Sequence, residues 1–397
     1  MKKKIVVRAP CLSQSGYGEQ ARFALRALRS KEDLFDIYAI PINWGQTGWI
    51  WEDNEERRWL DEIITKAAVY THKGGQFDMS LQITIPNEWE RVAPINIGYT
   101  AGIETTQCAP QWIEKANLMD RVIVVSNHSR EAYKGQDLNT EINVVNYCFQ
   151  HYDPEPIEQL KLETDFNFLA VSQWGPRKNF ENTIKWWVEE FYDRDVGLIL
   201  KTNIKSNSQI DFEYLKKNLK NMLKDYSDRQ CKIYLLHGDL SSENLAWLYQ
   251  HPKVKALVNI AHGEGFGLPM FEAAYNELPV ITIGWSGQLD YLYHNGRKYF
   301  SDVKYTMRSV QKETVWPGVI EENSMWAYAD QGSYKMKLRD MLKKYPKHLK
   351  RAKELKKIII KNFKAEDKYA EFCDAVFKPD PETEQWMESI NEVEEMV

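Results

Sequence analysis

One short segment, residues 254–283, limits the possible folds of this 397-residue chain more than any other. Residues 254–260 are apolar and β-branched, which predicts a buried strand, and residues 278–283 repeat the pattern. Residues 268–276 between them predict a short helix, with Pro269 in its first turn, where a missing N–H group costs nothing. Glycines allow a tight turn before this helix. Because its first N–H groups lack helical partners and the helix dipole is positive there, the segment predicts an anion site.

Two carboxylates flank this predicted anion site. Glu264 lies in the glycine-rich turn, and Glu272 lies about one turn inside the helix, where side chains lean toward the N-terminus. A carboxylate repels a phosphate, so these glutamates suit neutral hydroxyl groups better. A nucleotide sugar carries a diphosphate with hydroxyls on either side, and it therefore fits the pattern. The alternative is an ordinary strand–turn–helix with two solvated glutamates.

Residues 262–273, HGEGFGLPMFEA, resemble the Glu-x7-Glu motif EGFGLPxxEA of retaining GT-B glycosyltransferases of the family-4 type. The resemblance implies transfer of a sugar from a nucleotide diphosphate sugar, with retained anomeric configuration and no metal ion. It implies that Glu264 is a catalytic residue that holds the donor sugar and that Glu272 holds the ribose. In this family the leaving phosphate takes the acceptor proton. The motif also implies donor contacts from Gly265, Phe266, Gly267 and Leu268.

The start of the chain predicts a second anion cradle. A strand at residues 4–7 is followed by a loop containing Gly16 and Gly18 and by a helix from Glu19 to Arg29. A lone G-x-G is a weak signal for a phosphate site. In GT-B enzymes, however, the matching loop approaches the donor diphosphate. The resemblance therefore makes Gly16 and Gly18 candidate donor-binding residues.

A further candidate follows a strand at residues 95–100. Residues 99–104 resemble the family's Y-T-x-x-E pattern, which lies on the acceptor side, so Glu104 is a candidate catalytic residue. The alternative is a solvated loop glutamate. Many members of the family carry a histidine near this point, whereas this chain has Thr100 and Ala101.

Two cations precede the first helix of the second half. Arg177 and Lys178 lie just before a helix that begins near Phe180, where they oppose the helix dipole at about 0.3–1 kcal/mol each. A bound diphosphate would remove that conflict. The family carries P-R-K-N here, with the lysine on the diphosphate, which implies catalytic roles for both. The family often has another arginine a few residues earlier; residues 172–174 lack it, and Arg177 is the expected substitute.

Weaker donor-site candidates lie at the ends of two later strands. Lys201 ends one strand, and His237 follows another. Residues 238–249 resemble the family pattern G-x-[VL]-S-x-x-x-L…Y, which implies that this loop, with Leu240, holds the nucleotide base largely through its backbone. Residues 284–290 stand where the family has G-G-x-P-E, with Asp290 in place of the glutamate.

Three other segments have open interpretations. The aromatic loop at residues 43–51 is either a flap that contacts the acceptor or a surface loop packed on the core. Residues 334–363 predict a strongly basic helical region, either a solvated face or a contact for an anionic acceptor, membrane or nucleic acid. Residues 379–397 are acidic and predict a last helix that carries Trp386.

Composition excludes several classes of protein. The net charge of -5 and pI of about 6.0 do not fit a general nucleic-acid binder. The five cysteines are far apart, which favours reduced thiols over disulfides or zinc sites. The sequence shows no signal peptide and no run of about 18 apolar residues, so we expect a cytoplasmic protein, with peripheral membrane contact left open. No metal and no cofactor beyond the nucleotide sugar co-substrate are expected.

Strands alternate with helices in both halves, which predicts two doubly wound, Rossmann-like α/β domains. The resemblance implies that these domains face each other across a cleft, in the GT-B arrangement. The expected domains are residues 1–153 on the acceptor side, residues 154–365 for the nucleotide sugar, and C-terminal helices at 366–397 that cross back. The predicted reaction moves sugar from a UDP- or GDP-sugar to a glycan, lipid-linked or other hydroxyl acceptor. The alternatives are a catalytically silent GT-B sugar- or polymer-binding protein and an enzyme that glycosylates modified DNA bases.

Overall fold

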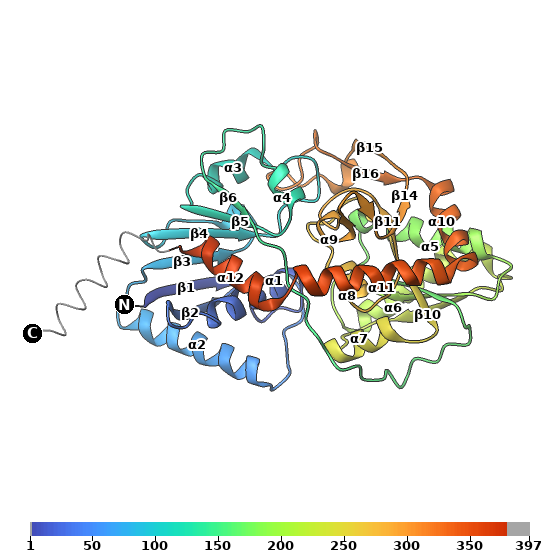
Figure 1. Ribbon diagram of the computed structural model, residues 1–397, viewed down its shortest axis with the longest axis horizontal. Coiled ribbons are helices and arrows are strands. Elements are labelled where there is room, and N and C mark those ends of the chain that lie inside the picture. The colour runs from blue at the N-terminus through green and yellow to red at the C-terminus, as the bar shows by residue number, and fades with distance from the viewer. Residues whose placement is uncertain (1, 379–397) are drawn as a thin grey trace, which may run out of the picture.

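The computed structural model describes residues 2–378 and contains two parallel, six-stranded sheets with helices packed on them (Figure 1). The N-terminal sheet has the order β2-β1-β3-β4-β5-β6. Its strands are β1 (Lys3–Ala9), β2 (Phe35–Pro41), β3 (Met79–Ile83), β4 (Ile95–Thr100), β5 (Arg121–Val124) and β6 (Ile142–Val144). Its helices are α1 (Gly16–Arg29), α2 (Glu55–His72), α3 (Pro110–Ala116) and α4 (Asn127–Glu131), with a 3₁₀ turn at Pro86–Glu88.

The C-terminal sheet has the order β14-β11-β10-β7-β8-β9. Its strands are β7 (Asn167–Val171), β8 (Gly197–Lys201), β9 (Lys232–Leu236), β10 (Val254–Asn259), β11 (Val280–Ile283) and β14 (Ser301–Val303). Its helices are α5 (Phe180–Phe191), α6 (Gln209–Met222), α7 (Ser242–Gln250), α8 (Leu268–Tyr275), α9 (Leu289–Leu292), α10 (Gln331–Lys343) and α11 (Tyr345–Asn362). Two antiparallel pairs follow β11 in sequence, β12 (Tyr293–His294) with β13 (Arg297–Lys298) and β15 (Tyr305–Ser309) with β16 (Met325–Ala329).

The central parallel strands are buried because helices cover both faces of each sheet, whereas the edge strands β6 and β9 are only partly buried. All four residues of β11 are buried, and in β1 successive side chains pack on opposite sides. Ile5 and Val7 join the cluster that includes Ala21 and Ala24 of α1, whereas Val6 packs with Ala67 of α2. The expected strand–turn–helix–strand over residues 254–283 is present as β10, α8 and β11.

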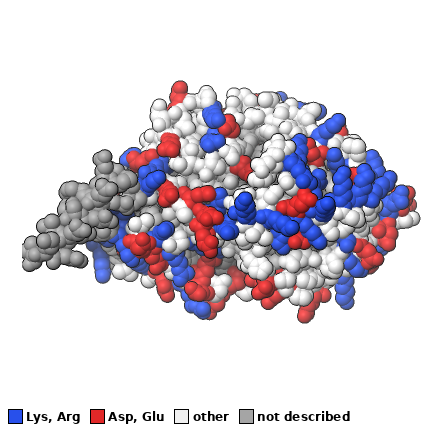
Figure 2. All heavy atoms as spheres, in the orientation of Figure 1, with Lys and Arg blue, Asp and Glu red and all other residues white. Residues whose placement is uncertain are grey.

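One predicted helix start was wrong. Helix α1 begins at Gly16 rather than Glu19, because the Ser15 side chain caps it by accepting a hydrogen bond from the Gly18 N–H group. The expected basic helical region over residues 334–363 is present as two helices, α10 and α11, which meet at Lys344. Pro346 in the first turn of α11 has no N–H group to continue the earlier helix. Figure 2 shows the Lys and Arg side chains gathered over this region.

The chain passes between the two sheets twice. Residues 145–166, which contain the expected boundary at residue 153, lead from β6 to β7. After α11, helix α12 (Ala365–Val376) packs against α1 of the N-terminal domain, as Figure 1 shows. The ring of Phe372 lies 5.6 Å from Phe23 and 5.1 Å from Tyr99. The predicted helix around Trp386 lies outside the described residues.

Candidate functional site

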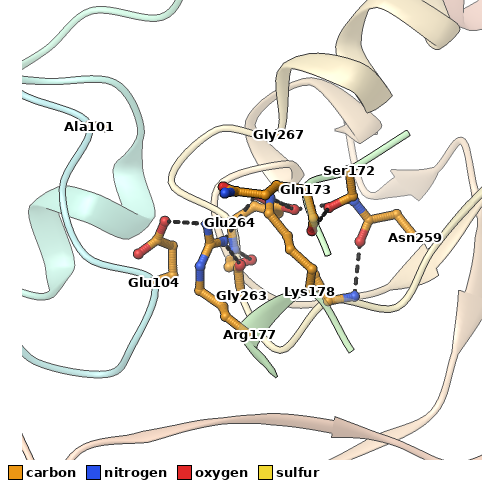
Figure 3. A network of polar contacts seen from close by, with 12 residues as sticks. Ala101, Glu104, Ser172, Gln173, Arg177, Lys178, Asn259, Gly263, Glu264 and Gly267 are labelled. Atoms are coloured by element: carbon orange, nitrogen blue, oxygen red, sulfur yellow. Dashed lines mark hydrogen bonds and ion pairs between the residues drawn. The ribbon is translucent and has the colours of Figure 1, made fainter. Parts of the chain in front are cut away.

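The four residues predicted to be catalytic form one network at the boundary between the domains (Figure 3). Lys178 Nζ lies 2.7 Å from both carboxylate oxygens of Glu264. Arg177 Nη1 lies 3.3 Å from Glu264 Oε2, and Arg177 Nη2 lies 3.1 Å from Glu104 Oε1. Since Glu104 follows β4 of the N-terminal domain and the other three belong to the C-terminal domain, Arg177 joins the two domains.

The local backbone structure determines the positions of Arg177 and Lys178. Arg177 and Lys178 lie in a 3₁₀ turn, Pro176–Lys178, between β7 and α5. The turn ends at Asn179, which has a left-handed backbone (φ 52°) and whose Nδ2 donates to Ile260 O at 3.1 Å. Asparagine tolerates this conformation better than most residues, and its amide bond holds the turn next to the end of β10.

Opposite charges determine the ionisation of the network. Burial alone would raise the pKa of Glu264, but Lys178 and Arg177 hold this pKa below its ordinary value. Burial, together with the charge of Arg177, lowers the pKa of Lys178. The Glu264 carboxylate also accepts from Asn259 Nδ2 at 3.2 Å, and its backbone N–H group donates to Ser286 Oγ at 3.0 Å. Glu264 is therefore an ionised carboxylate in a fixed position.

The glycines of the motif permit close approach of the two domains. A Cβ atom on Gly263 would lie 2.2 Å from Glu104 O, and one on Gly265 would lie 2.5 Å from Ala101 O. Gly267 caps α8 with a left-handed backbone (φ 86°). Within residues 2–378, the N–H groups of residues 265–267 donate no hydrogen bond, although these residues are buried. Buried, unpaired N–H groups at a helix start are free to bind an anion.

Glu272 is placed apart from the ion-pair network. It lies on α8, and Tyr249 OH of α7 donates to its Oε2 at 3.0 Å. Burial raises the pKa of Glu272 to about 7. Among residues 2–378, no Lys, Arg or His side chain forms an ion pair with Glu272, whereas Glu264 has two such partners.

The three weaker donor-site candidates, His237, Lys201 and Leu240, make different contacts in the structure. His237 Nε2 lies 3.0 Å from Asp211 Oδ1, and both side chains are almost fully buried. Asp211 also accepts from the N–H groups of Ile204 and Lys205, so the imidazole supports that loop. Lys201 Nζ donates to Gly238 O at 2.6 Å, and Leu240 packs against the core.

In the N-terminal domain, the two predicted donor glycines have different surroundings. Gly18 packs tightly, since a Cβ atom there would lie 1.8 Å from Ser13 O, while Gly16 is exposed with nothing within 4 Å of that position. Tyr17 between them bonds Thr100 Oγ1 at 2.8 Å, and its ring centroid lies 4.3 Å from that of Trp44.

The aromatic loop lies beside these residues and is paired with the loop before α1. Gln14 N donates to Gly48 O and Ile50 N donates to Leu12 O, both at 2.8 Å. Ile50 packs on the core, whereas Trp49 and Trp51 are 52% and 73% exposed. The segment therefore combines both predicted features, a contact with the core and exposed indole rings.

Several residues that contribute to the site were not among the predicted site residues. Asn259 and Ser286 hold Glu264, and Asp290 Oδ2 accepts from the N–H group of Asn127 at 2.9 Å and from Asn146 Nδ2 at 2.9 Å. Asp290 therefore joins the domains at a second point. The sequence showed that Asp290 replaces the glutamate of the family pattern, but it gave no signal of the contacts with Asn127 and Asn146.

Residues 2–378 contain no group of three or more His, Cys, Asp or Glu side chains that could hold a metal ion. All five cysteines are buried and free. None of the helices that the structure describes is both long and apolar enough to span a bilayer.

The comparison with solved structures identifies the architecture. Anabaena HepE, solved with UDP and glucose, superposes with a TM-score of 0.60 over 94% of this chain and 98% of its own, at 14% identity. The fold is GT-B. The sucrose-phosphate synthase of Thermosynechococcus elongatus shares this GT-B likeness, with a TM-score of 0.60 over 94% of this chain and 98% of its own, at 13% identity. The GT-B prediction is confirmed.

Comparison with known sequences matches a smaller part of the chain than comparison with solved structures does. No family model matches it. The serotype-specific mannosyltransferase WbdA of Escherichia coli is 32% identical over 116 residues, which are 29% of this chain and 13% of WbdA. The chain thus matches about an eighth of the length of that curated relative.

Proposed function

We propose that this GT-B protein is a retaining, metal-independent glycosyltransferase that takes its sugar from a UDP- or GDP-sugar. The observation that carries the proposal is the position of Glu264, which is held by Lys178 and Arg177 beside the unpaired N–H groups of residues 265–267. The likeness to a mannosyltransferase and to HepE, which was solved with UDP and glucose, supports it.

The proposed reaction depends on stabilisation of the negative charge of the leaving diphosphate. When the diphosphate leaves the sugar, negative charge builds up on its oxygens, and preorganised cations and N–H groups stabilise that charge. Lys178 and Arg177 supply the cations, and residues 265–267 supply the N–H groups. Glu264 accepts hydrogen bonds from hydroxyls of the donor sugar, and Glu272 accepts them from the ribose. The leaving phosphate takes the acceptor proton, so no separate base is needed.

Donor binding would rearrange the ion pairs. Without a donor, Glu264 accepts from Lys178 through both oxygens and from Arg177 through one. A diphosphate that binds Lys178 would replace part of this contact and free carboxylate oxygens for sugar hydroxyls. Glu104, on the N-terminal side of Arg177, would then face the acceptor.

The acceptor is a glycan, a lipid-linked sugar or another hydroxyl compound. The exposed indoles of Trp49 and Trp51 lie on the N-terminal domain, the predicted acceptor side. We place the reaction in the cytoplasm, and the exposed lysines of α11 suit peripheral contact with an anionic membrane.

The test is to incubate the protein with UDP-, GDP- and ADP-sugars and candidate glycan acceptors, with and without EDTA. We expect nucleotide release that EDTA leaves unchanged and a product that keeps the donor's anomeric configuration by NMR. Lys178→Ala should lower turnover about 100-fold or more, whereas the exposed Lys217→Ala should leave it unchanged. An inverted product, or full activity of Lys178→Ala, would refute this mechanism.

A further inference from the structure

The antiparallel pair β15–β16 extends from the C-terminal domain beyond its main sheet. The two strands pair from Tyr305 with Ala329 to Ser309 with Met325. Residues 310–324 connect them, with a 3₁₀ turn at Lys312–Thr314 and a bridge between Trp316 and Ile320. We call residues 305–329 the clasp.

The outer end of the clasp is bound to the N-terminal domain. Val319 is 7% exposed and packs in one apolar cluster with Trp89 and Trp112. Asn87 Nδ2 donates to Gly318 O at 2.9 Å. The contact therefore has an apolar centre and a directional hydrogen bond.

Closer to its strands, the clasp pairs with the segment that follows Glu104. The Thr106 N–H group donates to Met325 O at 2.9 Å, and the Met325 N–H group donates to Thr106 Oγ1 at 3.0 Å. Gln107 Nε2 donates to Asn323 Oδ1 at 2.7 Å. Because Thr106 is two residues from Glu104, the clasp holds the loop that carries the N-terminal partner of Arg177.

The inner face of the clasp is bound to His262, the residue before the glycine-rich turn. His262 Nδ1 lies 2.7 Å from Ala327 O, and the Ala327 N–H group donates to His262 O at 3.0 Å. The imidazole stacks on Trp326 at 5.0 Å and 13°. His262 Nε2 lies 3.2 Å from Gln311 Nε2. Burial lowers the pKa of His262, so the ring is neutral, with Nδ1 donating to Ala327 and Nε2 accepting from Gln311.

His262 is bonded directly to the ion-pair network. Its N–H group donates to Arg177 O at 2.8 Å, and the next residue, Gly263, accepts from Arg177 Nη1 at 2.8 Å. Arg177 is thus connected to the N-terminal domain in two ways. One is its own ion pair with Glu104, and the other runs through His262 and the clasp to Thr106 and Asn87.

We propose that the clasp holds the two domains closed and that His262 is a positioning residue, which places Arg177 between Glu264 and Glu104 only while the clasp is seated on the N-terminal domain. Release of the clasp would let Glu104 move away from Arg177 and open the boundary to a ligand. The role in turnover rests on the proposed function, but the opening itself does not.

Hydrogen exchange tests the opening without any ligand. We expect Val319→Asp to raise amide exchange about 10-fold at residues 101–106 and 262–267, because local opening exposes both sides of the boundary. Asn87→Ala removes the hydrogen bonds that Asn87 Nδ2 donates to Gly318 O and to Gln111 Oε1. It should raise the same signals to a smaller extent even if Val319→Asp folds poorly. Glu313→Ala, an exposed change on the same loop, should leave them unchanged. Faster exchange confined to residues 310–324 in both variants would refute the clasp.

Two substitutions at His262 distinguish a role in positioning Arg177 from a role in packing against Trp326. His262→Phe keeps a ring against Trp326 and the backbone bond to Ala327, but loses the side-chain bonds to Ala327 O and Gln311. His262→Asn keeps a donor near the Nδ1 position. We expect faster exchange at residues 262–267 in His262→Phe and recovery toward the wild-type rate in His262→Asn. Equal rates in wild type and His262→Phe would contradict the positioning role.

A disulfide would fix the closed state. Thr106→Cys with Met325→Cys places two exposed thiols on hydrogen-bonded neighbours, and the native cysteines are all buried. Oxidation should slow the release of bound UDP at least about 10-fold, and reduction should restore it. Equal release rates in the oxidised and reduced forms would refute closure by the clasp. Failure of the proposed function would show separately, as absence of binding of both UDP and GDP by the wild-type protein.

Discussion

Arg177 lies between two carboxylates that belong to different domains, 3.1 Å from Glu104 and 3.3 Å from Glu264. A planar guanidinium can bind two carboxylates at once, which an ammonium cannot do in the same geometry. Each of the three side chains is more than half buried, so bulk water screens these pairs only partly. Closure of the two domains and assembly of the site therefore depend on the same side chain.

Replacing Arg177 with lysine should distinguish the effect of its positive charge from the effect of its planar shape. Arg177→Lys keeps the positive charge but cannot reach Glu104 and Glu264 together, so we expect turnover to fall about 10- to 100-fold. Amide exchange at residues 101–106 should rise as well. Arg194→Lys, at an exposed arginine, is the matched control. Wild-type turnover and exchange in Arg177→Lys would show that only the charge matters.

Glu264→Gln should destabilise the ligand-free protein. The substitution leaves Lys178 and Arg177 without their shared anion, and we expect a loss of about 1–3 kcal/mol, reduced from the value for a fully buried pair because both cations are partly exposed. Urea unfolding measures this loss. UDP should restore the stability because its diphosphate supplies the missing negative charge, while turnover with a UDP-sugar stays low. Unchanged stability together with lost UDP binding would count against this arrangement.

Stability should depend on pH through Glu272. Burial raises the pKa of Glu272 from 4.5 to about 7, so between these values the folded protein keeps a proton that the unfolded chain has released. Its contribution to stability is therefore full below about pH 4.5 and is lost as pH rises toward 7. We expect Glu272→Gln to gain stability relative to wild type from pH 5 to pH 8, as measured by urea unfolding. Exposed Glu213→Gln should show no such trend, and a trend of opposite sign would contradict the raised pKa.

A methyl group at Gly263 should push the domains apart. The new Cβ atom would lie 2.2 Å from Glu104 O, a backbone atom that cannot rotate away. We expect Gly263→Ala to increase the radius of gyration in solution scattering and to lower turnover at least about 10-fold. Gly175→Ala is the matched control, because a Cβ atom there meets nothing within 4 Å and its backbone (φ -158°) is extended. Identical scattering from the two variants would count against a tightly closed boundary.

Local features of the fold were predictable because they depend on neighbouring residues. The apolar strands β10 and β11, the helix α8 between them and the turn at Arg177 and Lys178 follow from hydrophobic runs, glycines and a proline in one segment. The sequence did not predict that Ser15 caps α1, because several residues before the glycines could have served as the cap. The alternating strands and helices predicted the two sheets but not how they face each other.

Contacts between distant segments were not predictable in the same way. The pair of Arg177 with Glu104 and the bonds of Asp290 to Asn127 depend on domain closure, which one sequence does not encode in any local pattern. The ring of His237 bonds Asp211, which is 26 residues away in sequence. The clasp carries no recognised motif, and its two strands were not among the predicted strands.

The most direct test of the site is calorimetric titration of the wild-type protein and of Lys178→Ala and Lys217→Ala with UDP-, GDP- and ADP-sugars. We predict that at least one nucleotide sugar binds the wild type and Lys217→Ala equally well and binds Lys178→Ala at least about 10-fold more weakly, because Lys178 holds the diphosphate. No binding of any of these compounds to the wild type at millimolar concentration, or equal binding to Lys178→Ala, would contradict the proposal.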